Sequence, residues 1–237
     1  MKNTLAAAVS VCLLASAQTA LSYEPGDWIL RAGVVTVAPN SSSDDIALPT
    51  GLVAEARVDD DTQLSIIPAY MVDANWGVEL LAATPFEHNI EARGKGAIAG
   101  VSLDAGSTKH LPPTFMVQWY PRGDVDGWQP YVGFGLNYTL FFDEDVDGEL
   151  VDLLGDLTGG AVDGADLDLD PSWGLAAQVG VDIPVADQWS INLGVWYIDI
   201  DTEAKITATS AGAEVTTVKF DVDIDPWVYN IGVAYRF

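Results

Sequence analysis

The sequence predicts an all-β protein: an eight-stranded antiparallel transmembrane β-barrel with up-and-down topology, long extracellular loops and short periplasmic turns. Three observations predict it. Large apolar residues occupy every second position in several segments, long and short connections alternate between those segments, and the pattern continues to the last residue, Phe237. A period of two indicates a strand whose two faces meet different environments. An aromatic pattern that reaches the chain end fits a barrel wall better than a soluble domain, whose end would fray.

Eight segments carry this alternation. They run over residues 28–37, 63–72, 76–86, 114–120, 131–142, 173–183, 189–200 and 215–237. In the seventh segment, Trp189 and Tyr197 bracket the apolar face. Their eight residue steps, at about 3.3 Å each and tilted by about 40°, cover roughly 20 Å of membrane. This spacing predicts aromatic girdles at the two membrane interfaces.

The connections between the segments differ in length. Residues 37–63, 86–114 and 142–173 form long connections, and the connections between them are short. Long loops on one side and short turns on the other are typical of outer-membrane barrels, and an even strand count places both termini on the periplasmic side. A soluble β-sandwich also contains short alternating strands. That alternative does not explain the aromatic residues at the C-terminus or the alternation of long and short connections.

The N-terminal residues predict a secretory signal peptide. Lys2 precedes an apolar stretch from Leu5 to Ala17, which is too short to span a membrane. We expect residues 1–22 to be this signal and residues 23–237 to form the barrel domain. The single cysteine, Cys12, lies inside the signal, so the mature chain has no thiol chemistry. No later apolar run is long enough for a spanning helix, so membrane insertion requires a closed barrel.

The charge of the chain limits its partners. A net charge of −25 with only ten basic residues excludes nucleic acid binding. Nothing in the sequence predicts a cofactor. The acidic stretch 143–154 partly fits a calcium loop, because Asp143, Asp145 and Asp147 fall at its first, third and fifth positions. Its twelfth position is Leu154 where a glutamate is required, so these aspartates are only a weak metal candidate beside a solvated acidic loop.

The same acidic loop contains a short helical pattern. Residues 148–157 place Leu150, Leu153, Leu154 and Leu157 at helical spacing. We expect a short amphipathic helix whose leucines cap the barrel mouth.

The inward side chains predict a polar floor. An eight-stranded barrel is barely wide enough for its own side chains, which argues against a water-filled pore. Strand direction places the following inward residues near the periplasmic end: Arg31, Glu79, Gln118, Asp182 and Arg236. We expect the two arginines to pair with the two carboxylates, because pairing makes buried charge tolerable.

Nearer the outside, the inward residues Val35, Leu81, Ala83 and Trp196 are apolar. They predict a hydrophobic pocket that is open to the outside and closed below, with Leu81 and Trp196 on its wall. The alternative is that these residues merely pack the barrel.

Three prolines predict a side exit through the barrel wall. Pro85 ends the third segment, and Pro112 and Pro113 begin the fourth. Each lacks the N–H that a strand ladder needs. We therefore predict a gap between these strands near the outer membrane boundary, through which an apolar solute leaves for the bilayer.

The residues do not predict an enzyme. The two histidines of the chain, His88 and His110, flank the second long connection, and Ser107 is close to His110. No motif orients these residues as a catalytic triad.

Several motifs resemble the OmpW family of outer-membrane proteins. They are VELLAATPF (78–86), HLPPT (110–114), QWY (118–120), PYVGFGLNYTLFF (130–142), SWGLAAQVGVD (172–182), WYIDIDT (196–202), DPWV (225–228) and the final YRF. The resemblance implies an integral protein of the Gram-negative outer membrane, in contact with its lipids and lipopolysaccharide. It also implies a conduit for small hydrophobic molecules and recognition of Phe237 by the outer-membrane assembly machinery.

The loop 143–170 is unusually acidic for this pattern. This departure leaves open an alternative function, a non-transporting barrel that acts as a receptor, an adhesin or a structural protein.

Overall fold

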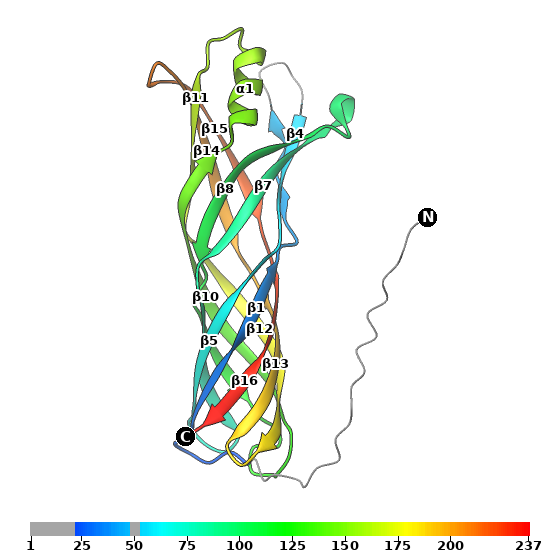
Figure 1. Cartoon of the computed structure of the whole chain (residues 1–237), viewed down its shortest axis with the longest axis vertical. Helices are drawn as coiled ribbons and strands as arrows, with labels where there is room; N and C mark the ends of the chain where they lie inside the picture. Colours follow the sequence, from blue (N-terminus) through cyan, green and yellow to red (C-terminus); the bar gives the residue numbers. More distant parts are fainter. Residues whose placement is uncertain (1–21, 48–52) are drawn as a thin grey trace, which may run out of the picture.

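The structure is a computed structural model that describes residues 22–47 and 53–237. Its lower part is a barrel of eight antiparallel strands (Figure 1). These strands are β1 (Trp28–Ala38), β5 (Asp61–Met71), β6 (Trp76–Ala83), β9 (Thr114–Trp119), β10 (Gln129–Val146), β12 (Ser172–Ala186), β13 (Trp189–Ile198) and β16 (Trp227–Arg236). The ladder runs β12-β13-β16-β1-β5-β6-β9-β10 and closes through pairing of β10 with β12. The predicted fold is confirmed, whereas the predicted signal peptide lies, except for Ser22, outside the described residues.

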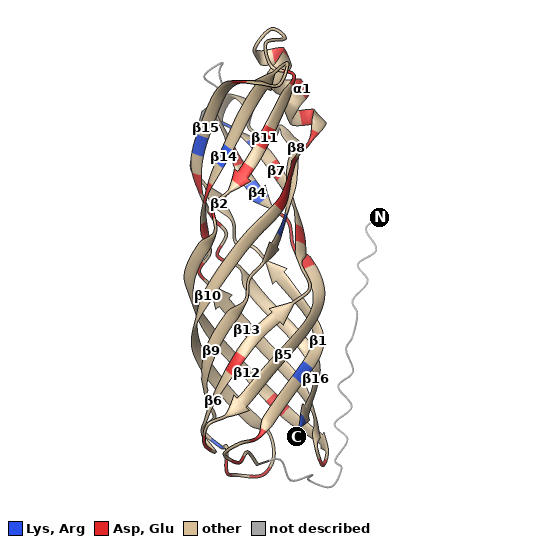
Figure 2. Ribbon diagram, turned by 90° about the vertical axis from the view of Figure 1, so that its left-hand side faces the viewer, with Lys and Arg blue, Asp and Glu red and all other residues tan. Residues whose placement is uncertain are grey.

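The outer wall of this barrel is apolar. On β16, Trp227, Tyr229 and Ile231 are 46%, 48% and 57% exposed. Most charged residues lie in the upper part of the molecule and at its lower rim, and the lower wall between them is almost free of charge (Figure 2). A surface of this kind is stable only against lipid.

Aromatic pairs mark both ends of the apolar wall. Trp28 lies against Tyr70 and Trp189 against Tyr235 at the lower rim, with ring centroids 5.1 and 4.7 Å apart. Higher on the wall, the pairs are Tyr138 with Trp173 and Tyr197 with Trp227, at 4.4 and 5.4 Å. The predicted aromatic girdles are therefore present at two levels, and we place the membrane-spanning segments between them.

Above the upper girdle the strands continue as an extension (Figure 1). One sheet of it has the order β10-β8-β7-β4-β3 and the other β11-β14-β15-β2. The added elements are β2 (Ser42–Ser43), β3 (Ile46–Ala47), β4 (Val53–Val58), β7 (Phe86–Lys95), the 3₁₀ turn η1 (Gly96–Ile98), β8 (Ser102–Leu111), α1 (Gly148–Leu157), β11 (Gly164–Leu169), β14 (Asp201–Ser210) and β15 (Ala213–Asp223). Much of the long predicted loops is thus strand.

The eighth predicted segment also needs correction. Residues 215–237 contain two strands, β15 and β16, rather than one. They are separated at Ile224–Pro226, where Asp225 has a positive φ of 39° and Pro226 cannot donate to a ladder. Among the described residues, no helix is both long enough and apolar enough to cross a membrane.

Candidate functional site

A buried ionic cluster closes the lower part of the barrel. Arg31 Nη1 lies 2.6 Å from Glu79 Oε2, and Arg31 Nη2 lies 2.6 Å from Asp182 Oδ2. Arg31 Nε also donates to Asp182 Oδ1 at 3.2 Å, which makes that pair bidentate. All three side chains are fully buried. We call this cluster the floor.

Neighbouring polar groups occupy the remaining positions around the floor carboxylates. Gln178 Nε2 donates to Glu79 Oε1 at 2.9 Å, and the Tyr23 hydroxyl donates to Asp182 Oδ2 at 2.7 Å. Asn192 Nδ2 donates to Asp182 Oδ1 at 2.8 Å. Every oxygen of the two carboxylates therefore accepts at least one hydrogen bond, as burial of charge requires.

The floor is completed by Gln118 and two further tyrosines. Tyr120 accepts from Arg31 Nη2 at 2.9 Å and donates to Gln118 Oε1 at 2.6 Å. The Arg31 guanidinium lies 4.9 Å from the ring centroid of Tyr131. That ring covers the backbone of Gly180, where a Cβ would clash with it. A glycine is required there because the aromatic ring occupies the space that any side chain would take.

The structure places four of the five expected floor residues together, namely Arg31, Glu79, Gln118 and Asp182. Arg236 lies elsewhere, and the expectation that it pairs with Glu79 or Asp182 is wrong. It is at the lower rim, where Nη1 lies 3.7 Å from Asp27 and donates to the carbonyl of Ser22. The reason is register, because Arg236 is paired with Ile29 at the end of the ladder, below the level of Arg31.

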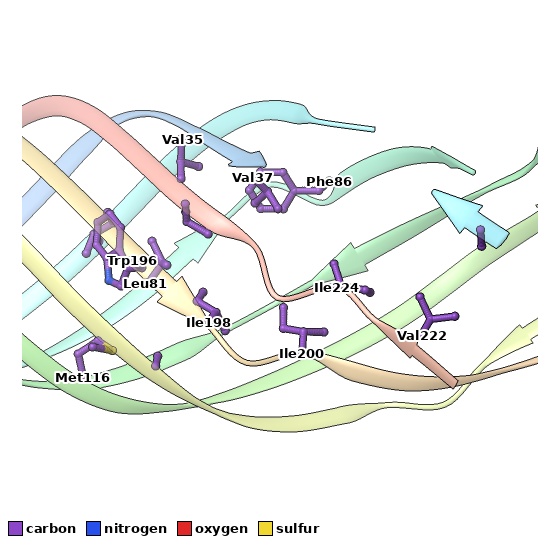
Figure 3. Close-up of a cluster of buried hydrophobic side chains, with 14 of the residues drawn as sticks. Val35, Val37, Leu81, Phe86, Met116, Trp196, Ile198, Ile200, Val222 and Ile224 are labelled. Atoms are coloured by element: carbon purple, nitrogen blue, oxygen red, sulfur yellow. The ribbon is translucent and has the colours of Figure 1, made fainter. Parts of the chain in front are cut away.

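Above the floor lies a packed apolar layer, which we call the plug. Val35, Ile67, Leu81, Met116 and Trp196 are each at most 4% exposed and belong to one continuous cluster (Figure 3).

The plug is tightly filled around Trp196. The indole ring lies against Gly194, where a Cβ would come within 2.5 Å of it. Ala83 packs against the same cluster. Val35, Leu81, Ala83 and Trp196, expected on the wall of a pocket, pack together inside the barrel at this level and do not line the cavity described next.

The open space lies higher, inside the extension. A cavity of about 260 Å³ is enclosed by its two sheets and by α1, with a lining that is almost entirely apolar. Its lower side is formed by Phe220, Val222 and Ile224, which belong to the same apolar cluster as the plug. Charged side chains such as those of Lys205 and Lys219 are exposed and pair with acidic neighbours outside. The extension therefore encloses an apolar chamber within a polar shell.

The helix α1 forms one wall of this cavity. It spans Gly148–Leu157 as the sequence predicts, and all four expected leucines line the cavity. The Asp147 carboxylate accepts from the N–H of Glu149 at 2.8 Å and so caps the first turn.

Loss of this cap is expected to loosen α1. Asp147→Ala removes one of the few partners of the orphan N–H groups, at a cost of about 1 kcal/mol to the helix. Hydrogen exchange of the amides at 149–151 is expected to accelerate by about fivefold, while amides of β12 stay unchanged. Asp152→Ala, on the same helix but away from its start, is the matched control. Equal acceleration in both variants would contradict a capping role.

Two histidines lie at the base of the cavity, just above the upper girdle. His88 Nε2 and His110 Nε2 are 3.3 Å apart, and His88 Nδ1 donates to the carbonyl oxygen of Asp59. Both residues line the cavity although they are only 2% and 1% exposed overall. Burial lowers the pKa of His110 to about 3 and also lowers the pKa of His88, so both imidazoles are neutral at pH 7.

The strand ladder is interrupted beside these histidines. Pairing of β6 with β9 ends at Leu81–Thr114, and pairing resumes between β7 and β8 at Phe86–His110. Pro85, Pro112 and Pro113 all fall in the intervening stretch.

Each side of the interruption is held by its other neighbour. The N–H of Thr84 donates to the carbonyl of Leu64 on β5 at 3.0 Å. The carbonyl of Pro112 accepts from Thr114 Oγ1 at 2.9 Å and from Asn137 Nδ2 at 3.3 Å. No strand pair of the described residues therefore joins the two edges between Leu81–Thr114 and Phe86–His110.

The acidic residues are not arranged as a calcium loop. Asp143 lies 3.2 Å from Lys109 Nζ, and Asp147 caps α1. The described group of three acidic side chains whose oxygens converge within 4.8 Å is a different one, Asp199, Asp201 and Asp225. In that group Asp225 accepts from the N–H of Ile200 and from the Tyr197 hydroxyl, which gives it a structural role in the turn.

Comparison with known proteins agrees with this geometry. The OmpW family profile matches residues 24–237. Outer membrane protein W of Vibrio cholerae serotype O1 is 43% identical over 237 residues, covering all of both chains. The crystal structure of OprG from Pseudomonas aeruginosa has a TM-score of 0.78 at 41% identity, covering 92% of this chain and 99% of that one. The dibenzothiophene metabolism operon protein PahQ of Pseudomonas aeruginosa is 26% identical over 243 residues, covering all of both chains.

Proposed function

Because this chain belongs to the OmpW family of outer-membrane β-barrel proteins, we propose that it takes up small hydrophobic molecules from outside the cell. The observation that supports this most is the cavity of about 260 Å³ with an apolar lining, enclosed by an extension that is polar on its outside. An apolar molecule gains free energy on leaving water for such a site, at roughly 25 cal/mol per Å² of apolar surface.

The floor directs the molecule away from the periplasmic end of the barrel. Passing Arg31, Glu79 and Asp182 would require breaking a fully buried ion cluster without replacing its hydrogen bonds. The plug above the floor is also closely packed. A route down the barrel axis is therefore more costly than a route through the wall.

The interrupted ladder offers that route. It lies between Leu81–Thr114 and Phe86–His110, and the cavity reaches it at His88 and His110. Separating the two edges there breaks no ladder pair, so an apolar molecule can pass from the cavity into the outer leaflet at low cost. We assign Pro85, Pro112 and Pro113 to this side exit.

The class of transported molecule follows from the cavity and from one relative. The lining favours apolar molecules without charge, because an ion would lose its hydration there without a partner. PahQ carries the name of an operon for metabolism of dibenzothiophene, an apolar aromatic compound. We propose no catalytic role for the chain.

A disulfide across the interruption tests the exit. Register continued from Leu81–Thr114 brings Thr84 opposite Leu111. The variant Thr84→Cys/Leu111→Cys is expected to slow uptake of an apolar fluorescent probe into cells about tenfold when oxidised, and to recover when reduced. The residues 23–237 contain no other cysteine, so the bridge forms without competition.

A second disulfide, placed where the ladder is continuous, controls for the general effect of cross-linking two strands. Thr36→Cys/Thr62→Cys joins β1 and β5, whose ladder is continuous there and whose hydroxyls are 2.7 Å apart. This control is expected to leave uptake unchanged. Equal uptake by both oxidised variants would contradict the proposed side exit. A wild-type protein that binds cell-surface ligands but transports nothing would favour the receptor alternative.

A further inference from the structure

The hydrogen bonds of the His88–His110 pair run in one direction. A carbonyl oxygen can only accept, so the contact of His88 Nδ1 with the carbonyl of Asp59 places the single hydrogen of the neutral His88 ring on Nδ1. His88 Nε2 therefore carries a lone pair and accepts from His110 Nε2, which lies 3.3 Å away. The neutral His110 ring then has its hydrogen on Nε2, and its Nδ1 ends the chain as an acceptor.

No protein group donates to this last acceptor. Over residues 22–47 and 53–237, the one hydrogen bond of the His110 ring is the bond to His88. The neighbours that hold the ring are aromatic, with Phe86 edge-on at 5.3 Å and Phe141 at 5.9 Å between centroids. Because a buried acceptor without a partner costs free energy, a molecule that brings a donor to His110 Nδ1 gains more than contact with the apolar lining.

The other polar side chains on the cavity lining, within the part of the chain that the structure describes, are three threonines. The Thr108 hydroxyl donates to the carbonyl of Lys109 at 3.4 Å, and the Thr202 hydroxyl donates to the carbonyl of Asp170 at 2.7 Å. Thr216 is exposed and lies near the opposite end of β15 from Phe220 and Val222. The imidazole pair is therefore the main polar feature at the base of the cavity.

We propose that the cavity selects apolar molecules that carry one neutral N–H or O–H group, which donates to His110 Nδ1. This inference rests on the proposed binding of apolar molecules in the cavity, and it adds the polar group that they carry. A charged donor such as an ammonium is disfavoured, because the lining offers no counter-ion. The bonds from His110 to His88 and from His88 to Asp59 polarise the chain, which strengthens its terminal acceptor.

Two flat tricyclic molecules separate the hydrogen bond from the apolar contact. Carbazole and dibenzofuran have nearly the same shape as dibenzothiophene, but carbazole presents an N–H where dibenzofuran presents an oxygen. An engineered apolar cavity of about 150 Å³ already binds benzene. The cavity of about 260 Å³ in this protein has room for a larger fused aromatic molecule.

Equilibrium dialysis of both probes tests the preference. The protein is held in lipid nanodiscs at pH 7.5, and empty nanodiscs measure the partition of each probe into lipid. Carbazole is expected to bind about fivefold more tightly than dibenzofuran, the ratio that one neutral hydrogen bond of about 1 kcal/mol produces. His110→Phe keeps an aromatic ring without the acceptor and is expected to abolish the preference.

The outcomes distinguish this proposal from the proposed function. Equal affinity of the wild type for the two probes would overturn the selectivity and leave binding of apolar molecules intact. Absence of binding by either probe would overturn both. A preference that persists in His110→Phe and disappears in Thr108→Val would assign the contact to the threonine and also overturn the proposal.

Nitrogen NMR of the wild type decides if His110→Phe does not fold. The chain contains two histidines, so ¹⁵N-histidine labelling without a tag reports only on this pair. We expect hydrogens on His88 Nδ1 and His110 Nε2, and we expect carbazole, but not dibenzofuran, to shift the signal of His110 Nδ1. A His110 Nδ1 signal that carbazole does not move would overturn the proposal.

Discussion

Replacing Arg31 by methionine is expected to lower the free energy of unfolding by about 3–5 kcal/mol, because it leaves two carboxylates buried without their cation. Arg31 is the one cation that the structure places within hydrogen-bonding distance of Glu79 and Asp182 among the described residues. Methionine keeps most of the side-chain volume, so the loss measures charge rather than a cavity. The measurement is urea unfolding in lipid vesicles, followed by tryptophan fluorescence.

A compensated variant separates charge from packing. Arg31→Met/Glu79→Gln/Asp182→Asn removes all three charges and is expected to recover most of the lost stability, since uncharged groups need no counter-ion. Arg236→Met is the matched single control, because that arginine is partly exposed at the rim and pairs only weakly at 3.7 Å. A loss below about 1 kcal/mol for Arg31→Met would show that the floor ions are solvated.

Filling the cavity is expected to reduce uptake more than any other single change in the extension. Ala204 on β14 is 2% exposed and lines the cavity, so Ala204→Phe places a ring inside it. Overpacking against a bound molecule costs about 1–3 kcal/mol, which corresponds to a loss of uptake of roughly fivefold to hundredfold. The measurement is uptake of an apolar probe by cells or by vesicles that contain the purified protein.

A lipid-facing substitution of the same kind is the control. Ala32→Phe adds the same ring on the exposed face of β1 and is expected to leave uptake unchanged. Both variants must first show the heat-dependent gel mobility of a folded barrel. Normal uptake by Ala204→Phe would mean that the transported molecule does not pass through the cavity.

The membrane barrel is predictable from the sequence because lipid requires large apolar residues on the outer face of each strand, whereas the inner face carries small or polar ones. Large apolar residues alternate with glycine, asparagine and serine in β10, β12 and β13, and this alternation predicts the three strands to within a few residues at most of their ends. The same alternation does not reveal the extension strands, because their outward residues face water and are polar, while their inward residues are apolar. In β14, Ala204 and Ile206 point inward while Glu203 and Lys205 point outward. A search for large apolar residues at every second position therefore classes this strand as a polar loop.

The sequence predicts which types of side chain form the floor and the cavity wall, but not the level along the barrel axis at which the cavity lies. Charge and alternation identify four floor residues, whereas they miss Tyr23, because it precedes the first strand and folds back to Asp182. Trp196 is expected on a pocket wall, but a single strand pattern does not show which opposite side chains already fill the lumen. The prediction for the four leucines of α1 is confirmed, because leucines at helical spacing in an otherwise acidic loop indicate a helix with one buried face.

The length of β10 decides how far the extension reaches beyond the membrane. Its 18 residues, at about 3.3 Å each and tilted by about 40°, rise roughly 45 Å, whereas the hydrocarbon band is about 25 Å thick. The mouth therefore stands well above the acyl chains, at the height of the sugar layer that repels oily compounds. Under the proposed function, a solute captured there would be delivered to the membrane from the side without having to dissolve in carbohydrate.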